Sequence, residues 1–338
     1  MNTMSSRSLR AGGSPYEIGK ALGARCGSLL GQTIDTYIQQ GPSRFGSVDV
    51  SRLRPGALPW LRHLPQRFQD EIEGLADGSG LPLQRLAEWS YVEACTTYGC
   101  SSVLSSFDQG HPWVGRNNDL WAPSVWGYST VRDHQRRLST LSFGMPAEPF
   151  TCTGVNERKL WLHYHYLPPR DRDPAPPDAW FEFVWMTEAL ETCSDLEDVE
   201  SLLGDRPRRG CMLLFAVDGK SDRRAVYQCE PTSFLRWPDS GASLPGTNHR
   251  YGEQHPSPGS AHRLQRIHQL LGLPTADPPL HRLRTLLADP EVEQNEDGSG
   301  TVFSAIACPA TGEIWFTFGG YPAASHGRWE PVPWPWVA

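Results

Sequence analysis

The order of the expected secondary-structure elements restricts the fold more than any other feature of the chain. Helical spacing of apolar residues dominates the sequence before residue 100, whereas short runs typical of β-strands follow it. Farther along come two helices, a second group of strands, two more helices and a late hairpin around residues 309–312. Because strands and helices do not alternate strictly, this order argues against a doubly wound parallel sheet. It favours an α+β fold in which mostly antiparallel sheets are flanked by layers of helices.

Caps, turn residues and periodicity set the expected boundaries. Ser14 is expected to cap the first helix, with Pro15 in its first turn and Glu17 completing a capping box. We expect a loop at residues 44–57 and an exposed, proline-rich loop at residues 167–178. Helices are predicted at 14–40, 61–76, 83–95, 180–192, 194–203, 261–271 and 279–288, and strands at 101–104, 113–117, 140–143, 150–155, 159–165, 212–217, 225–230, 234–237, 301–308 and 313–319.

The composition narrows the class of function. The 338 residues carry a net charge of −7 with no block of like charges, which argues against nucleic acid and an anionic membrane as partners. No apolar stretch approaches the ~20 residues of a membrane span, and no signal peptide is visible, so a cytoplasmic protein is expected. The eight cysteines include no CxxC pair and no metal-ligand spacing, so no metal site is predicted.

One cysteine lies in a context that suggests chemistry. Cys100 occurs in Tyr98-Gly99-Cys100-Ser101-Ser102; Arg116 follows it by 16 residues (116 − 100) and Asp119 by 19 (119 − 100). If residues 100–104 and 113–117 pair around a turn at Asp108-Gln109-Gly110, then a thiol, a guanidinium and a carboxylate meet at one end of a hairpin. A cysteine thiolate is a strong nucleophile, so the arrangement predicts a nucleophile with charged supports.

Seven segments spread over the chain form a combined pattern: Gly13–Gly19, Glu71–Gly80, Gly99–Ser102, Gly115–Asp119, Gly154–Glu157, Thr247–His249 and Ser260–Arg266. Together they resemble the penicillin acyltransferase family of N-terminal-nucleophile hydrolases and, more distantly, conjugated bile salt hydrolases and penicillin V acylases. The resemblance implies a four-layer αββα sandwich that forms one domain over residues 1–338. It also implies self-cleavage between Gly99 and Cys100, after which a helical chain 1–99 stays packed against a catalytic chain 100–338.

The resemblance also implies roles for single residues. Cys100 would be the nucleophile, and its freed α-amine, with an ordinary pKa near ~8, would be the general base. Arg116, Asp119 and Arg263 would form the supporting charge network. The backbone N–H of Asn156 and the side-chain amide of Asn248 would stabilise the tetrahedral oxyanion. The side chains expected to contact substrate are those of Trp113, Trp121 and His249.

The sequence leaves several functions open. An autoprocessed amidohydrolase or acyltransferase acting on a small acylated molecule fits best, and nothing in the sequence decides between water and an amine as the acceptor. No cofactor is expected, although acyl-CoA remains an option as the acyl donor, and homo-oligomerisation is also open. A papain-like protease would keep Cys100 internal and pair it with His165 or His249. A binding protein with the same fold would never cleave.

Overall fold

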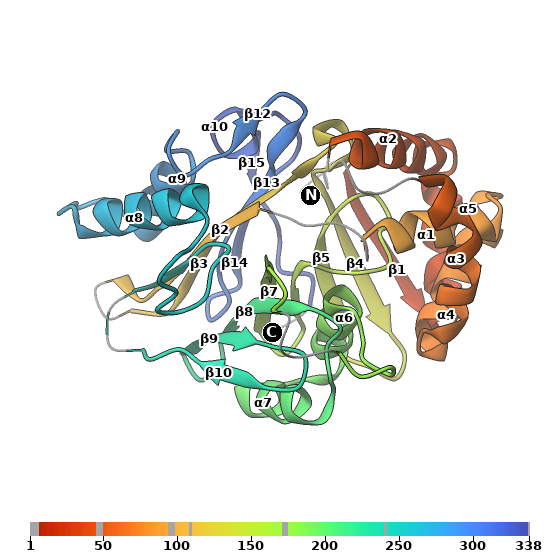
Figure 1. Ribbon diagram of the computed structural model, residues 1–338, viewed down its shortest axis with the longest axis horizontal. Helices are drawn as coiled ribbons and strands as arrows, with labels where there is room; N and C mark the ends of the chain where they lie inside the picture. The colour runs from red at the N-terminus through yellow and green to blue at the C-terminus, as the bar shows by residue number, and fades with distance from the viewer. Residues whose placement is uncertain are drawn as a thin grey trace.

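The computed structural model describes residues 7–44, 50–93, 99–107, 110–170, 175–239, 241 and 243–336 (Figure 1). Two sheets form the centre of the molecule. The first sheet has eight strands in the order β1 (Ser8–Gly13), β4 (Tyr128–His134), β5 (Thr140–Gly144), β6 (Thr153–Asn156), β7 (Leu160–Leu167), β8 (Cys211–Asp218), β9 (Arg223–Cys229) and β10 (Phe234–Arg236).

The second sheet has seven strands. Its path is β11 (Ser243–Gly246), β2 (Gly99–Ser105), β3 (Trp113–Trp121), β13 (Ser299–Cys308), β14 (Glu313–Thr317) and β15 (Trp329–Pro331), and β12 (Asn295–Glu296) pairs with β13. Within the described strands, neighbours run antiparallel except β1 and β4, which are parallel. The two sheets pack face to face through aromatic side chains; the ring centroids of Phe143 and Phe316, for example, lie 4.6 Å apart.

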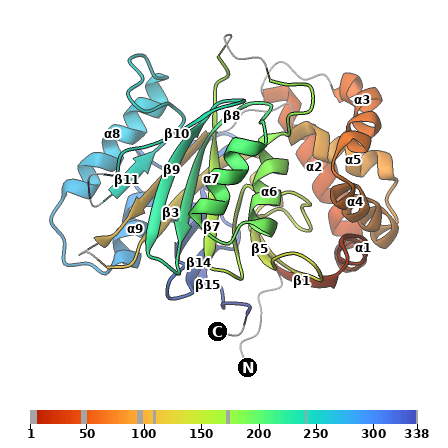
Figure 2. The same ribbon diagram turned by 90° about the horizontal axis from the view of Figure 1, so that it is seen from below.

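Helices cover the outer face of each sheet. On the first sheet, α6 (Glu182–Thr192) and α7 (Leu196–Asp205) pack on β6 to β9 (Figure 2). On the second sheet, α8 (Pro258–Gly272) and α9 (Pro279–Leu287) pack on β2, β3 and β13. The layers therefore run helix, sheet, sheet, helix, which confirms the predicted α+β fold and its four-layer αββα arrangement.

The first third of the chain adds a helical group at the β1 end of the first sheet, visible in red and orange in Figure 1. It consists of α1 (Pro15–Cys26), α2 (Ser28–Arg44), α3 (Val50–His63), α4 (Gln66–Ser79) and α5 (Leu83–Glu93), and the short α10 (Ala323–His326) lies near the C-terminus. Helices α1 and α4 approach so closely at Gly19 that a Cβ atom there would lie only 2.0 Å from the carbonyl oxygen of Glu71. The absence of a side chain at Gly19 therefore permits this packing. The segment Glu71–Gly80 is thus a helix-packing segment.

The N-terminal half of the fold both confirms and corrects the predicted boundaries. Ser14 and Glu17 form the expected capping box, but the first helical region is interrupted at Gly27, which has φ of 47°. Residues 50–57 were expected to be a loop and are helical, because α3 packs on α5 and buries Ala57 and Leu61. The helix predicted at 61–76 was wrong at its start: α3 ends at His63 and α4 begins only after Pro65.

The sequence patterns also failed to predict β1 and β4, the parallel pair at one edge of the first sheet. The predicted turn at Asp108-Gln109 lies outside the described residues, as do residues 45–49 of the expected loop. Among the helices that the structure describes, none has both the length and the apolar character needed to cross a membrane.

Candidate active site

Cys100 lies at the start of β2, directly opposite Asn118 of β3. Successive strand residues point to opposite faces, so Cys100 shares its face with Ser102, and Asn118 shares its face with Arg116. This face looks toward the first sheet, because Arg116 reaches the backbone of Tyr164 in β7. The thiol is only 1% exposed, and it is therefore buried between the two sheets.

Arg116 is the cation nearest to the thiol. Its Nη2 lies 3.6 Å from the Sγ of Cys100 and donates to the Oδ1 of Asn118 at 2.6 Å, while Nη1 donates to the Tyr164 carbonyl at 2.9 Å. Burial raises the pKa of the Cys100 thiol, and the Arg116 guanidinium offsets part of this rise. Because the pKa remains above the usual value, the thiol is protonated at neutral pH in the uncleaved chain.

Asp119 supports the site from the opposite face of β3. It lies three residues after Arg116, so its side chain points toward α8 rather than toward the thiol. Its Oδ2 accepts from Arg263 Nη1 at 3.0 Å, and its Oδ1 accepts from the hydroxyl of Thr301 at 2.7 Å. Burial raises the pKa of Asp119, while Arg263 and Thr301 oppose that shift. The cation paired with Asp119 is therefore Arg263, whereas Arg116 serves the thiol.

Arg263 of α8 connects the two sides of the nucleophile. The same Nη1 that binds Asp119 also donates to the carbonyl oxygen of Cys100 and to the hydroxyl of Ser101, each at 3.0 Å. Its Nη2 donates to the Oδ1 of Asn248 at 3.0 Å. Buried at 6% exposure, Arg263 fixes the backbone on the C-terminal side of the Gly99–Cys100 peptide bond.

Asn248 binds the backbone nitrogen of the nucleophile. Strand β11 pairs with β2 so that Gly246 lies opposite Ser102, which brings Asn248 alongside Cys100 two residues later. Its Oδ1 accepts from the N–H of Cys100 at 2.8 Å, and its Nδ2 donates to the carbonyl of Tyr166 at 3.0 Å. The amide nitrogen that was expected to face an oxyanion thus holds Tyr166, and the amide oxygen orients the nitrogen that cleavage would free.

Asn156 was expected at the site, but the structure does not bring it there. Its Nδ2 donates to the carbonyls of Leu190 and Cys193, and its Oδ1 accepts from the backbone of Arg158 and Leu160. The residue of this segment that lines the cavity beside Cys100 is Cys152, which directly precedes β6 and lies four residues, or about 13 Å at ~3.3 Å per residue, before Asn156. Asn156 instead fastens the β6–β7 turn to the end of α6.

The expected substrate contacts also lie elsewhere. Trp113 lies at the far end of the β2–β3 hairpin, opposite Ser105, and packs into the apolar cluster beneath α8 and α9. Trp121 is a core residue: its ring stacks on Tyr37 with centroids 4.5 Å apart, and its indole N–H donates to the Tyr37 carbonyl. His249 Nδ1 lies 2.8 Å from the hydroxyl of Ser260, which also accepts from the backbone N–H of Asn248. His249 therefore supports the Asn248 loop.

Two residues of the site escaped the sequence analysis. Asn118 Oδ1 faces the Cys100 sulfur at 3.8 Å, and its Nδ2 is buried with no hydrogen-bond partner among the described residues. Cys152 Sγ lies 3.9 Å from the same oxygen. Asn118 could have been found from strand register, since it lies two residues after Arg116 and opposite Cys100. With Arg116, Leu120, Trp126, Glu148 and Tyr164, these residues and Cys100 line a cavity of about 10 Å³.

That cavity offers room for roughly one water molecule. It is therefore too small in the uncleaved chain to accept an acyl group beside the thiol. The unpaired amide N–H of Asn118 points to the chemistry of this space, because buried donors are normally satisfied. The cavity therefore brings together the thiol of Cys100, the guanidinium of Arg116 and the unpaired amide donor of Asn118.

The two histidines near Cys100, His163 and His165, contact Ser102 rather than the thiol. His163 Nε2 and His165 Nε2 lie 2.9 Å and 2.7 Å from the hydroxyl of Ser102, and His165 Nδ1 lies 3.0 Å from the Thr247 carbonyl. Burial, with Arg116 close by, lowers the pKa of both rings well below the usual value, so both are neutral at pH 7. Within the described part of the chain, no group of three or more metal-binding side chains comes together.

Comparisons with known proteins give a limited picture. No family model matches the chain, and a search of curated proteins finds no match. Among solved structures, a penicillin V acylase from Agrobacterium tumefaciens is 12% identical with a TM-score of 0.46, covering 69% of this chain and 86% of that one.

Two other structures cover the same share of this chain. The Caenorhabditis elegans ortholog of N-acylethanolamine-hydrolyzing acid amidase is 12% identical with a TM-score of 0.44 and is covered completely. A variant of the conjugated bile acid hydrolase from Clostridium perfringens is 11% identical with a TM-score of 0.40 and is covered to 97%. The fold described above rests on the sheets and helices of this chain itself.

Proposed function

We propose that this chain cleaves its own Gly99–Cys100 bond and then acts as a cysteine amidohydrolase on a small acylated molecule. The observation that carries the proposal is the set of contacts at Cys100. Its sulfur has Arg116, its N–H has Asn248, and its carbonyl has Arg263. The thiol, the N–H and the carbonyl of Cys100 are thus each held by a polar side chain, and two of these side chains, Arg116 and Arg263, are buried, as a nucleophile that reacts at its own amide requires.

The first reaction is an N-to-S acyl shift. The Cys100 sulfur attacks the Gly99 carbonyl carbon, the C–N bond breaks, and the proton passes to the departing nitrogen, which becomes the α-amine of Cys100. Water then hydrolyses the Gly99 thioester to a carboxylate and returns the thiol. Asn248 Oδ1 already accepts from this nitrogen and would keep the new amine oriented.

In the second reaction, the freed α-amine takes the proton of the thiol, and the sulfur attacks the substrate's amide carbonyl. The tetrahedral oxyanion needs a prepositioned donor, and we assign this role to the Nδ2 of Asn118, which is buried, unpaired and directly across from Cys100. The amine leaves with the proton, and water releases the acyl group from Cys100. Transfer to an amine instead of water would use the same intermediate.

A papain-like mechanism has less support. It requires an imidazole beside the thiol, yet His163 and His165 contact Ser102, and His249 contacts Ser260. A binding protein that never cleaves would need no unpaired donor beside a buried thiol. The acyl-enzyme mechanism accounts for both the charge set and the free amide of Asn118.

The test compares two cysteines of the same cavity. The purified protein should contain chains of 99 and 239 residues (338 − 99), the second beginning with Cys100, by intact mass and N-terminal sequencing. Cys100→Ala should remain a single chain. Cys152→Ala, the matched control from the same cavity, should cleave like the parent.

A panel of N-acyl amides then tests the second reaction, with acyl-Cys100 trapped by acid quench and detected by mass. An intact single chain that retains amidase activity would sink the cleavage step. Cleavage of Cys100→Ala would sink the assignment of the nucleophile. Loss of activity on substituting His165 in an uncleaved chain would favour the papain-like mechanism.

A further inference from the structure

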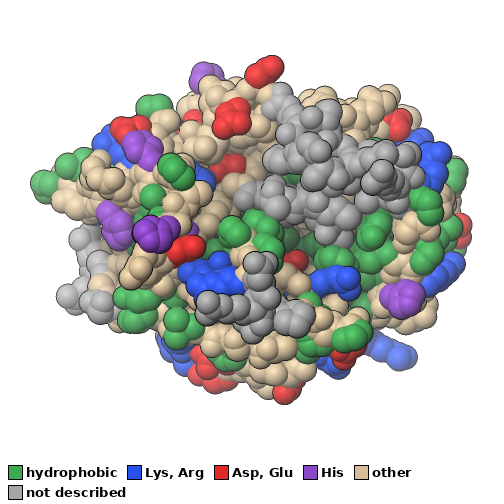
Figure 3. Space-filling model, viewed as in Figure 1, with side chains coloured by type: hydrophobic (Ala, Val, Ile, Leu, Met, Phe, Trp, Pro, Cys, Tyr) green, Lys and Arg blue, Asp and Glu red, His purple; other side chains and the backbone are tan. Residues whose placement is uncertain are grey.

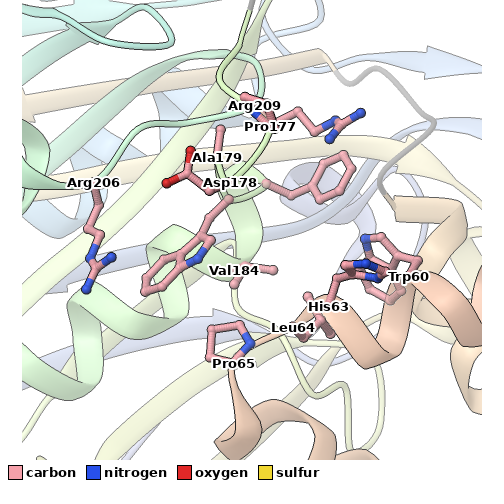
Figure 4. A pocket seen from close by; sticks show the side chains of 12 residues that line it. Trp60, His63, Leu64, Pro65, Pro177, Asp178, Ala179, Val184, Arg206 and Arg209 are labelled. Atoms are coloured by element: carbon pink, nitrogen blue, oxygen red, sulfur yellow. The ribbon is translucent and has the colours of Figure 1, made fainter.

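A second cavity, of about 640 Å³, lies outside the Cys100 site (Figure 4). Trp60 and His63 of α3 border one side, and residues 177–181, ahead of α6, border the other. Leu64 and Val184 supply apolar surface between them, and Arg206 and Arg209, from the segment after α7, lie at separate borders. This volume falls within the ~300–1,000 Å³ that is common for small-molecule sites.

The lining combines aromatic rings with two guanidinium groups. Arg206 lies over the ring of Trp180 at 5.1 Å, and Arg209 lies over the ring of Phe181 at 5.3 Å. In the described part of the chain, no carboxylate forms an ion pair with either guanidinium, although the exposed Asp178 also lines the cavity and Glu182 lies close enough to Arg209 for their charges to interact. Figure 3 shows hydrophobic, basic and acidic side chains interspersed on the face viewed there. Arginines that lie over aromatic rings and form no ion pair of their own remain available to bind an anionic ligand.

Contacts link this cavity to the Cys100 site through Tyr166, at the end of β7. The carbonyl of Tyr166 accepts from Asn248, which holds the nitrogen of Cys100. Arg209 of the cavity precedes Cys211 by two residues, and Cys211 pairs with Leu167, the residue that follows Tyr166 in β7. The aromatic cavity and the nucleophile therefore lie at the same end of β7.

We propose that this cavity binds an amphipathic organic anion, with its ring or chain among Trp60, Trp180 and Phe181 and its anionic group on Arg206 or Arg209. The inference rests on the proposed function in one respect: the bound group is the part of the substrate that lies beyond the scissile amide. The substrate class is then an amide that carries a carboxylate or comparable anion on an apolar body.

The binding test needs no catalysis. Cys100→Ala protein is titrated with 4-phenylbutyrate and with its neutral analogue 4-phenylbutan-1-ol, by calorimetry and tryptophan fluorescence. The acid should bind about tenfold more tightly than the alcohol, because a charged pair is the stronger hydrogen bond. The double substitution Arg206→Gln/Arg209→Gln should remove that preference and leave binding of the alcohol unchanged. Arg158→Gln, at an exposed arginine of the β6–β7 turn, is the matched control and should change neither.

Equal affinity for the acid and the alcohol, or no effect of the double substitution, would overturn the inference, as would failure of the acid to bind. The cavity assignment and the proposed function can fail independently of each other. Binding of the acid by a chain that neither cleaves nor hydrolyses amides would leave the cavity assignment in place and remove the function. Cleavage and amidase activity without binding of the acid would leave the proposed function in place and overturn the cavity assignment.

Discussion

Two buried clusters of charge differ in a way that separates architecture from chemistry. One surrounds Cys100; the other joins α4, β4 and α6. In the second cluster, Glu71 accepts from Arg132 Nε at 2.8 Å and from Arg67 Nη1 at 3.1 Å, and Arg67 also binds Glu191. Burial alone would raise the pKa of Glu71, but Arg132 and Arg67 hold it below the usual value. Glu71 and Glu191 are thus both paired with cations, and they share Arg67.

The Cys100 cluster has charges of similar burial but a different composition. It contains a nucleophile whose pKa is raised, a donor on Asn118 with no partner among the described residues, and a cavity between them. Perturbed charges alone would mark both clusters as candidate sites. The comparison teaches that an unsatisfied donor beside a nucleophile is the more selective sign of chemistry.

Removing the Glu71 charge should have the largest effect, and it should fall on stability. In Glu71→Gln the guanidinium groups of Arg67 and Arg132 lose their shared carboxylate, and breaking a buried pair in this way costs about 3–5 kcal/mol. Urea unfolding measures it, with the exposed Glu157→Gln as the control. A loss of less than about 1 kcal/mol in the free energy of unfolding would mean that this cluster contributes little to stability.

Removing the unpaired donor should act on rate instead. Asn118→Leu is expected to slow acyl transfer from substrate by about 10²–10³, the usual cost of one oxyanion-hole donor. The unfolding midpoint should change far less than in Glu71→Gln, and the pH dependence should keep its midpoint because the nucleophile is unchanged. Unaltered turnover in Asn118→Leu would refute the assigned role.

Glu182 sharpens the comparison, because it is a half-buried residue whose Oε1 atom is shielded from water and has no hydrogen-bond partner in the described structure. Burial raises its pKa to about 7, although Arg208 and Arg209 lie nearby. A raised folded-state pKa means that the folded protein holds the proton more tightly. Stability should therefore fall as the pH rises from about 4.5 to 7, by roughly 3 kcal/mol at ~1.4 kcal/mol per pKa unit.

Urea unfolding at pH 5 and pH 8 measures this, and Glu182→Gln should lose most of the difference. The paired Glu71 predicts no such loss over that range, because its pKa is already below the usual value. A pH-independent parent protein would show that Glu182 is satisfied by water.

The smallest effect concerns the pH profile of cleavage. Since burial raises the pKa of Cys100, cleavage should accelerate about tenfold per pH unit below that pKa, following the thiolate fraction. Arg116→Gln removes the cation that opposes the rise, so its profile should shift to higher pH and its cleavage should be slower than the parent's at each pH measured. Arg116→Lys should retain the parent rates. Time courses of intact mass from pH 6 to 9 give these rates, and an unshifted Arg116→Gln profile would contradict the assignment.

The sequence predicted those parts of the fold that local chemistry decides. The Ser14 cap, the β2–β3 hairpin strands and the antiparallel sheets flanked by helices follow from caps, periodicity and element order, whereas the count of four layers came from the family resemblance. Helix α3 did not, because Pro55 and Pro59 suggest a loop, whereas packing of Ala57 and Leu61 against α5 keeps the segment helical. Tertiary contacts of this kind are invisible in a short window of sequence.

The site divides in the same way. The spacing of Cys100, Arg116 and Asp119 was readable, but which cation serves which partner depends on the face of β3 that each occupies. Asn118 needed the register of two strands. Asn156 resembled a site residue by its neighbours in sequence, yet its hydrogen bonds lie at the opposite end of β6 from Cys152.

The parallel pairing of β1 with β4 has a further consequence. Six residue pairs, from Ser8–Ser129 to Gly13–His134, join the segment before Gly99 to the segment after Cys100. If the bond between those two residues is cut, the folded molecule becomes a heterodimer whose parts are held by strand pairing and the helix contacts around β1. Its unfolding then becomes a dissociation, so the midpoint should rise with protein concentration, while the uncut Cys100→Ala chain should show no such dependence.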